Sequence, residues 1–147
     1  MHLQPAVFVP LLLVGIALMQ ALVWIPILLV TRRRRAAATA ALHTELQQAG
    51  EHVVRGPTQA LKRQGRTSRT GVLVLTKRRL LFLGGGRTEI PVGEIQSVRA
   101  DKWFNGNYRN GVPWMILTTE RTGEVGFMTG DGRDGWTDVV RGAMAKG

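Results

Sequence analysis

The chain has 147 residues, a formal net charge of +10 and no cysteine. Without cysteine, disulfides, zinc–thiolate sites and thiol catalysis are excluded. An apolar N-terminal segment uses about 30 residues, so the remainder suffices for one small domain and not for two.

The first element is an apolar run, Ala6–Val30, followed at once by the cations Arg32, Arg33, Arg34 and Arg35. A bilayer core of roughly 30 Å needs about 20 apolar residues in a helix, because lipid offers no partner for unpaired backbone groups. The run predicts a transmembrane anchor over residues 1–31. Cationic flanks stay cytoplasmic, and no Lys or Arg precedes the run, so we expect a single-pass protein of the plasma membrane with its N-terminus outside.

A cleaved signal peptide is the main alternative for this segment. Such a peptide carries its positive charge before a shorter apolar core and ends at small residues. Ala36-Ala37-Ala38 satisfies the small-residue rule, but it lies behind the four arginines. The order of the features therefore favours an anchor.

Residues 32–50 form a predicted basic stop and helical linker. Strong helix formers fill Ala36–Gln48, and Gly50 is a natural end. We expect about three helical turns here, which act as a spacer that continues the span. Self-association through the alanines is the alternative, which the lack of a sustained heptad disfavours.

The periodicity changes at Glu51, where the predicted cytoplasmic domain, residues 51–147, begins. Short apolar runs alternate with turn residues, and this pattern is typical of an antiparallel sheet or barrel. The runs are Val53-Val54, Gly71–Leu75, Arg79–Leu83, Glu89–Pro91, Ile95–Val98, Trp114–Thr118 and Glu124–Met128.

Turn signals separate these runs. Asn105-Gly106 and Asn110-Gly111 are dipeptides that accept the positive φ of tight hairpins. We also expect turns or connections at Thr76-Lys77-Arg78, Gly84-Gly85-Gly86 and Thr119–Gly123.

The chain closes with a predicted amphipathic helix. Asp131 and Asp134 stand near its start, and Arg141 and Lys146 stand near its end, where the helix dipole favours each charge. One helix after a set of strands suits the cap of an open barrel mouth. Its apolar stripe consists of Trp136, Val139, Val140 and Met144.

Three segments together match one family pattern. Gly71–Phe82 contains Thr-x-x-Arg-Leu, Ile90–Val98 contains Ile-Pro-x-x-x-Ile, and the last helix has an early Trp136. With this order of elements, residues 50–145 resemble a bacterial pleckstrin-homology-like (PH-like) domain of the GRAM type. The resemblance implies a mainly-β barrel of two bent antiparallel sheets with seven strands, capped by the C-terminal helix. Such barrels bind phosphoinositides, other anionic lipids or proteins, so it also implies a binding module.

The sequence contains few residues that could catalyse a reaction. His2, His43 and His52 are not grouped, and the two serines have no evident base. Gly130–Gly135 matches G-x-G-x-x-G, the glycine motif of dinucleotide-binding proteins. Only twelve residues follow it, so the acidic residue that binds the ribose about 20 positions further on is not present. We therefore expect no enzymatic activity, no metal and no cofactor.

Nine cations with no acid among them lie between His52 and Thr88. Anionic cytoplasmic lipids attract such cations by about 1 kcal/mol each near the surface, and a tethered domain needs only weak affinity. We therefore predict anionic lipid contact, with solvated strand edges as the alternative. The predicted lipid-binding residues are Lys62, Arg63, Arg66 and Arg69 in a loop, and Lys77, Arg78 and Arg79 in a hairpin.

Trp103, Phe104 and Tyr108 lie in a predicted hairpin tip. They could contact the membrane interface or a protein partner, or pack across the hairpin beside Trp114. A protein-interaction or scaffold module localised by its anchor is therefore the alternative function. The charge alone would also permit nucleic-acid binding. The sequence shows neither a recognition helix nor strand aromatics spaced to stack on bases, so this function is disfavoured.

Overall fold

The computed structural model describes residues 5–108, 111–130 and 135–146. Asn110, for which a turn is expected, and Asp131 and Asp134, expected near the start of the last helix, lie outside the described residues. The chain divides into two compact units, residues 1–37 and 38–147. The elements are α1 (Pro5–Gln48), β1 (Val53–Gln64), β2 (Thr67–Thr76), β3 (Arg79–Leu83), β4 (Arg87–Pro91), η1 (Val92–Glu94), β5 (Ile95–Asp101), β6 (Trp103–Phe104), β7 (Asn107–Tyr108), β8 (Trp114–Thr119), β9 (Gly123–Thr129) and α2 (Trp136–Met144).

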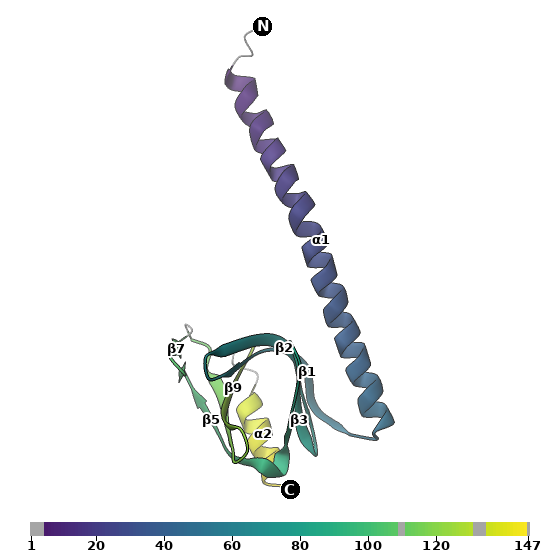
Figure 1. Cartoon of the computed structure of the whole chain (residues 1–147), viewed down its shortest axis with the longest axis vertical. Coiled ribbons are helices and arrows are strands. Elements are labelled where there is room, and N and C mark those ends of the chain that lie inside the picture. Colours follow the sequence, from purple (N-terminus) through teal and green to yellow (C-terminus); the bar gives the residue numbers. More distant parts are fainter. Residues whose placement is uncertain (1–4, 109–110, 131–134, 147) are drawn as a thin grey trace. The chain divides into compact units, whose positions relative to one another are not determined.

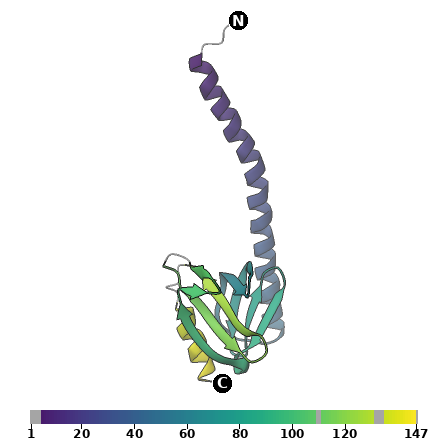
Figure 2. The same ribbon diagram turned by 60° about the vertical axis from the view of Figure 1, so that its left-hand side comes forward.

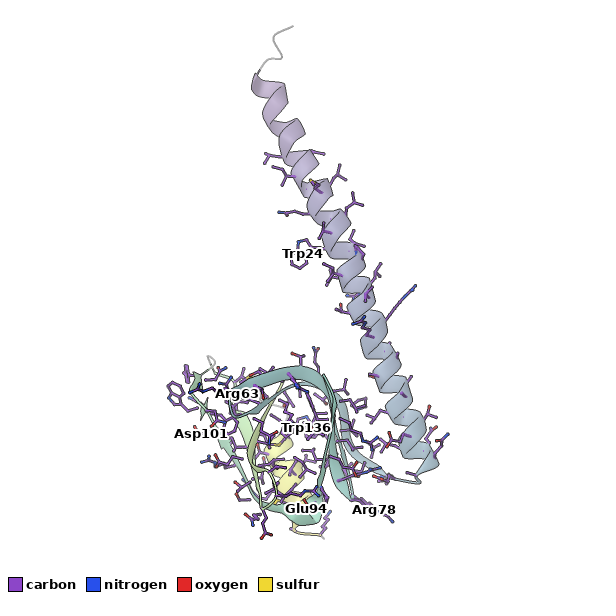
Figure 3. The ribbon with its side chains drawn as sticks, in the orientation of Figure 1. Trp24, Arg63, Arg78, Glu94, Asp101 and Trp136 are labelled. Atoms are coloured by element: carbon purple, nitrogen blue, oxygen red, sulfur yellow. The ribbon has the colours of Figure 1, made fainter. Side chains whose placement is uncertain are left out.

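The first unit holds the apolar part of α1. Side chains from Leu13 to Val30 are exposed apart from a half-buried Ala21, and Trp24 stands out from the helix in Figure 3. Met19 is 75% exposed and Leu22 is 73% exposed. A helix that is apolar all round is stable only where its surroundings are apolar too. The helix is long and apolar enough to cross a membrane, as the sequence predicts.

The second unit contains one antiparallel sheet of seven strands, in the order β4-β3-β2-β1-β9-β8-β5. All seven predicted strands are present. The expected division into two sheets is wrong, because β1 has twelve residues and pairs with strands of both halves. It pairs with β2 along its length and with β9 through Ala60–Arg63. The sheet is therefore continuous, and β1 and β2 curve around α2 in Figure 1.

The main core lies between the sheet and α2. Trp136 is 2% exposed and Val140 is fully buried, while Val139 and Met144 pack against the same core. The apolar stripe predicted for the last helix is thus confirmed. In Figure 2 the strands are seen side by side, with α2 next to β5, which it contacts.

The last turns of α1 cover part of the opposite face of the sheet. Leu42 and Leu46 are each 2% exposed and form a cluster with Val74 of β2 and Leu81 of β3. The sequence predicts a helical spacer here, and the structure shows in addition that the end of this helix packs on the sheet. The difference arises because the apolar partners on β2 and β3 are more than 25 residues away in the chain, so helix propensity alone did not reveal them.

A small hairpin of β6 and β7 covers another part of that face. Phe104 is 3% exposed and packs on Trp114, with 5.9 Å between ring centroids. A Cβ on Gly126 would come within 2.4 Å of the Phe104 ring, so glycine makes this close approach feasible. The hairpin turns at Asn105-Gly106, as predicted.

Candidate anion-binding pocket

A pocket of about 210 Å³ opens between the β1–β2 hairpin and the β3–β4 connection. No carboxylate lines it, and two of its lining cations, Lys62 and Arg69, form no ion pair among the described residues. The lining residues are Lys62, Gln64, Thr67, Arg69, Gly84, Gly86, Arg87 and Thr88.

Two glycines bring the walls of the pocket together. A Cβ on Gly71 would lie 2.1 Å from the carbonyl oxygen of Leu83, and one on Gly84 would lie 2.4 Å from that of Thr70. Any larger residue would force β2 and the connection apart. The close approach lets Arg69 donate a hydrogen bond to the carbonyl oxygen of Gly85, which ties the glycine loop to β2.

Lys62 lies at the centre of this arrangement. Its Nζ donates a hydrogen bond of 2.7 Å to Thr88 Oγ1 across the pocket. Burial lowers the pKa of Lys62 below its ordinary value, and the positive charge of Arg69 lowers it further. No carboxylate among the described residues forms an ion pair with this ammonium, so an anion in the pocket would supply a counter-charge that stabilises it.

The structure gives Arg79 a different role from the predicted lipid contact. Its guanidinium lies 2.5 Å from Glu51, 2.7 Å from Glu89 and 3.8 Å from Glu45, and the side chain is 17% exposed. Its hydrogen bond to Glu51 is the main cause that raises the pKa of Arg79, and the same bond lowers the pKa of Glu51. This arginine holds α1, β3 and β4 together and presents no free charge to a ligand.

Arg87 belongs partly to the same network. It donates hydrogen bonds of 2.8 and 2.7 Å to the two carboxylate oxygens of Glu45, and one of 3.1 Å to Glu89. These bonds, that to Glu45 first, raise its pKa. Although Arg87 lines the pocket, its charge is already matched by carboxylates.

The structure also changes the setting of Arg63 and Arg66. The segment predicted as a loop is the β1–β2 hairpin, in which Arg63 lies on β1 and Arg66 lies in the exposed turn. Arg63 donates hydrogen bonds of 3.0 Å to Ser68 Oγ and 2.9 Å to the carbonyl oxygen of Asn105. It thus ties β1 to the β6–β7 hairpin.

Lys77 and Arg78 are exposed in the β2–β3 turn, as predicted. This turn lies at the end of β2 opposite to Thr67 and Arg69, which line the pocket. Figure 3 shows Arg63 and Arg78 at opposite ends of the sheet. The cations predicted to contact lipid from the loop and from the hairpin therefore lie at opposite ends of β2.

The aromatic hairpin is divided in the same way. Trp103 is 59% exposed and Tyr108 is 50% exposed, and their rings lie 5.9 Å apart, whereas Phe104 is buried. Cross-strand packing and an exposed aromatic surface, offered as alternatives from the sequence, are therefore both present on different residues.

The four arginines that follow the apolar run were predicted to set the orientation in the membrane. Arg32, Arg33 and Arg34 have exposed side chains, while the side chain of Arg35 lies outside the described residues.

Sequence reasoning missed the neutral part of the pocket, Gln64, Thr67 and Thr88. The alternation of a strand would have found Gln64, because residues two apart lie on the same face, had β1 been extended past Val54. It also missed the pairing of Glu45, Glu51 and Glu89 with arginines, since those contacts join distant parts of the chain. Among the described residues, no group of three or more acidic or histidine side chains could hold a metal ion.

No protein-family model and no curated protein matches the chain. Among solved structures, a C-terminal domain of an unknown protein from Leishmania infantum is similar, with a TM-score of 0.57 and 16% identity over 74% of this chain and 98% of that one. The Vps36 N-terminal PH domain is similar with a TM-score of 0.51 and 15% identity, over 67% of this chain and 82% of that one. At such identities the likeness concerns the fold alone. The second unit therefore has a fold like that of a PH domain.

Proposed function

We propose that this chain is a single-pass membrane protein whose cytoplasmic PH-like domain, of the GRAM type, binds anionic lipid headgroups without catalysing a reaction. Residues 1–31 are the anchor, residues 32–50 the basic stop and linker, and residues 51–147 the binding domain. Arg32–Arg35 keep that domain on the cytoplasmic side. The observation that supports the proposal is the pocket in which neither Lys62 nor Arg69 has a carboxylate partner among the described residues.

The chemistry of the pocket suits a phosphate group. Lys62 and Arg69 supply positive charge, and the Thr88 hydroxyl, which accepts a hydrogen bond from Lys62, can donate its own hydrogen to an anion. The backbone of Gly84 and Gly86 can approach an anion closely, because no side chain intervenes. A headgroup phosphate would neutralise the desolvated ammonium of Lys62.

Weak intrinsic affinity is sufficient for a tethered domain. The anchor keeps the domain at the membrane, so each encounter with a headgroup occurs at high effective concentration. Two cations near an anionic surface contribute about 2 kcal/mol together, which corresponds to roughly thirtyfold in affinity.

Flotation of residues 38–147 with liposomes tests the proposal. This fragment retains Leu42 and Leu46, which belong to the packed unit, and circular dichroism verifies that it is folded. We expect flotation with phosphatidylcholine liposomes that contain phosphatidylglycerol and none with phosphatidylcholine alone. Soluble glycerol phosphate that competes would show that the phosphate itself is recognised.

The variant Lys62→Gln with Arg69→Gln should lower binding at least about tenfold, because both side chains would lose charge-assisted hydrogen bonds to the headgroup phosphate. The matched control is Lys77→Gln with Arg78→Gln, which removes the same charge at the opposite end of β2. We expect the control to lose much less binding. Equal losses in both variants would show attraction by general surface charge and would contradict a headgroup pocket.

An exposed aromatic pair supports a protein-interaction module as the second candidate function. Trp103 and Tyr108 present two rings on a short hairpin that Arg63 anchors, and exposed aromatic side chains are frequent anchors of interfaces. If the fragment floats with neither liposome and Trp103→Ala abolishes capture of a purified membrane partner, this second function is the correct one.

A further inference from the structure

The pocket that contains Lys62 and Arg69 is small for a ligand site. Its volume of about 210 Å³ lies below the range of about 300–1,000 Å³ that is usual for small-molecule sites in proteins. This size favours a single phosphate group with a short alcohol over a ring that carries several phosphates.

Arg87 also lines the pocket, and Glu45 of α1 holds its guanidinium. Arg87 donates hydrogen bonds of 2.8 and 2.7 Å to the two carboxylate oxygens of Glu45. A bidentate pair of this kind fixes the position of the arginine as well as matching its charge. The pocket thus offers a ligand the charges of Lys62 and Arg69, while that of Arg87 is directed to α1.

The ion pairs around Arg87 contain more acid than base. Both carboxylate partners of Arg87, Glu45 and Glu89, also pair with Arg79. Arg79 in turn binds Glu51. Within these ion pairs, three carboxylates meet two guanidinium groups, so one negative charge is in excess. Because Arg87 lines the pocket, this excess lies beside it and opposes a multiply charged anion more than a singly charged one.

Two neutral side chains that line the pocket can accept hydrogen bonds. Thr67 Oγ1 donates its hydrogen to the carbonyl oxygen of Gln64 at 2.9 Å, so the hydroxyl oxygen remains an acceptor. Gln64 Nε2 donates to the carbonyl oxygen of Thr122 at 3.5 Å, which leaves Oε1 as an acceptor. These oxygens suit the hydroxyl hydrogens of an alcohol. A cationic alcohol such as choline would instead lie beside Lys62 and Arg69 and be repelled.

Building on the proposed function, we propose that the pocket selects a headgroup with one phosphodiester and a neutral, hydroxyl-bearing alcohol such as glycerol. The phosphodiester lies against Lys62 and Arg69, and the alcohol donates to Thr67 and Gln64. Glu45 sets the charge that the pocket accepts, because it holds Arg87 away from the ligand. Glu45 is thus a specificity-determining residue that acts through Arg87 and does not touch the ligand.

Calorimetric titration of the full-length protein in phosphatidylcholine nanodiscs tests this selectivity with soluble probes. Glycerophosphoglycerol has a phosphodiester and a neutral alcohol, glycerophosphocholine has the same phosphodiester with a cationic alcohol, and pyrophosphate carries several negative charges. We expect glycerophosphoglycerol to bind at least about tenfold more tightly than glycerophosphocholine. Pyrophosphate should bind no more tightly than glycerophosphoglycerol, in spite of its greater charge.

The variant Glu45→Gln should change this preference. It should tighten binding of glycerophosphoglycerol about twofold and that of pyrophosphate about tenfold, because the Coulomb energy of an anion is proportional to its charge. Glu45 is 38% exposed, and the buried Leu42 and Leu46 keep the end of α1 packed. The variant should therefore remain folded, which circular dichroism verifies.

The matched control is Glu124→Gln. It removes the same charge from the exposed ion pair with Arg99, and neither residue lines the pocket. We expect this control to change the affinity for both probes equally and by less than about twofold. Equal responses to Glu45→Gln and Glu124→Gln would overturn the role of Glu45, as would a wild-type protein that binds pyrophosphate more tightly than glycerophosphoglycerol.

The variant Gln64→Leu tests recognition of the alcohol. It should weaken binding of glycerophosphoglycerol about fivefold, the effect of one hydrogen bond, and leave pyrophosphate binding unchanged. Unchanged binding of glycerophosphoglycerol would contradict this recognition. If no probe binds the wild-type protein, the anion pocket of the proposed function is itself refuted.

Nanodiscs that contain phosphatidylglycerol distinguish a lipid headgroup from a soluble phosphodiester. The tethered domain meets this lipid at high effective concentration, so the lipid should weaken binding of glycerophosphoglycerol at least about tenfold. The reference is nanodiscs with the same fraction of phosphatidylserine, which match the surface charge. Equal binding in the two kinds of nanodisc would refute a lipid headgroup as the ligand, while the effect of Glu45→Gln on the soluble probes would still test the charge selectivity of the pocket.

Discussion

Two groups of cations that are neighbours in the sequence have opposite surroundings in the folded domain. Arg79 and Arg87 lie among Glu45, Glu51 and Glu89, where α1 meets β3 and β4. Lys62 and Arg69 face a pocket to which the described part of the chain contributes no carboxylate. The first group stabilises the fold, and the second leaves positive charge available to a ligand.

The comparison shows that cation density alone is a poor guide to a binding site. The carboxylates that neutralise Arg79 and Arg87 come from α1, from the segment before β1 and from β4. A charge is available when the fold brings no acid to it. The following predictions test this division, from the largest expected effect to the smallest.

Replacing Arg79 by methionine should have the largest effect on stability. The substitution leaves the carboxylate of Glu51, which is 8% exposed, without its main partner. We expect the free energy of unfolding to fall by about 2 kcal/mol, less than for a fully buried pair because Arg79 is partly exposed. Urea denaturation of residues 38–147 measures the change. The double variant Arg79→Met with Glu51→Gln should recover part of the loss, and a loss near zero for Arg79→Met would refute the structural role.

Acid should weaken the same network more gently. The hydrogen bonds from Arg79 lower the pKa of Glu51 and of Glu89 below the ordinary value of 4.5. The folded state then binds fewer protons than the unfolded state, so this stabilisation is complete above about pH 4.5 and is lost as pH falls through the lowered values. Thermal unfolding across this range should show the decline, and Arg79→Met should flatten it. An unchanged profile in that variant would contradict the assignment.

Replacing Arg87 by methionine should cost less, about 0.5 kcal/mol. Arg87 is 43% exposed and Glu45 is 38% exposed, so water screens the pair in spite of its two parallel hydrogen bonds. The effect should shrink further in high salt. A loss as large as that of Arg79→Met would mean that the network acts as one unit.

Replacing Lys62 by methionine should change stability least and in the opposite direction. Because burial disfavours the charged lysine, its pKa is lowered from 10.5. The unfavourable contribution is present at neutral pH and is relieved as pH rises towards 10.5. We expect a change between zero and a small gain in the free energy of unfolding. NMR titration of the Lys62 Cε resonance should show its pKa rise when glycerol phosphate binds, and no rise would count against an anion in the pocket.

Much of the fold could be predicted from the sequence. Alternating apolar runs and turn dipeptides identified seven strands, and the stripe that begins at Trp136 identified the last helix. Strand β1 was predicted only in part, because the sequence analysis identified it at Val53-Val54 and not over the rest of its length. Its remaining residues, from Arg55 to Gln64, are mostly polar, because the strand is half-exposed along most of its length.

The candidate site was predicted only in part. Lys62 and Arg69 were found through their charge. Arg63 and Arg79 were included for the same reason, although in the fold Arg63 forms hydrogen bonds that connect β1 to the β6–β7 hairpin and Arg79 forms ion pairs. Short-range pattern does not reveal that Glu45 and Arg87 meet, since 42 residues separate them. The aromatic residues show the same limit, because the sequence does not distinguish buried Phe104 from exposed Trp103.

The sequence by itself determined that an apolar helix precedes a small β-rich domain with an excess of cations, because hydrophobic periodicity and composition are local properties of a chain. Only the tertiary structure decided which of those cations are neutralised and which remain available. That decision depends on carboxylates and backbone groups brought close in space from distant positions, and Coulomb interactions act over distances in space and not along the sequence.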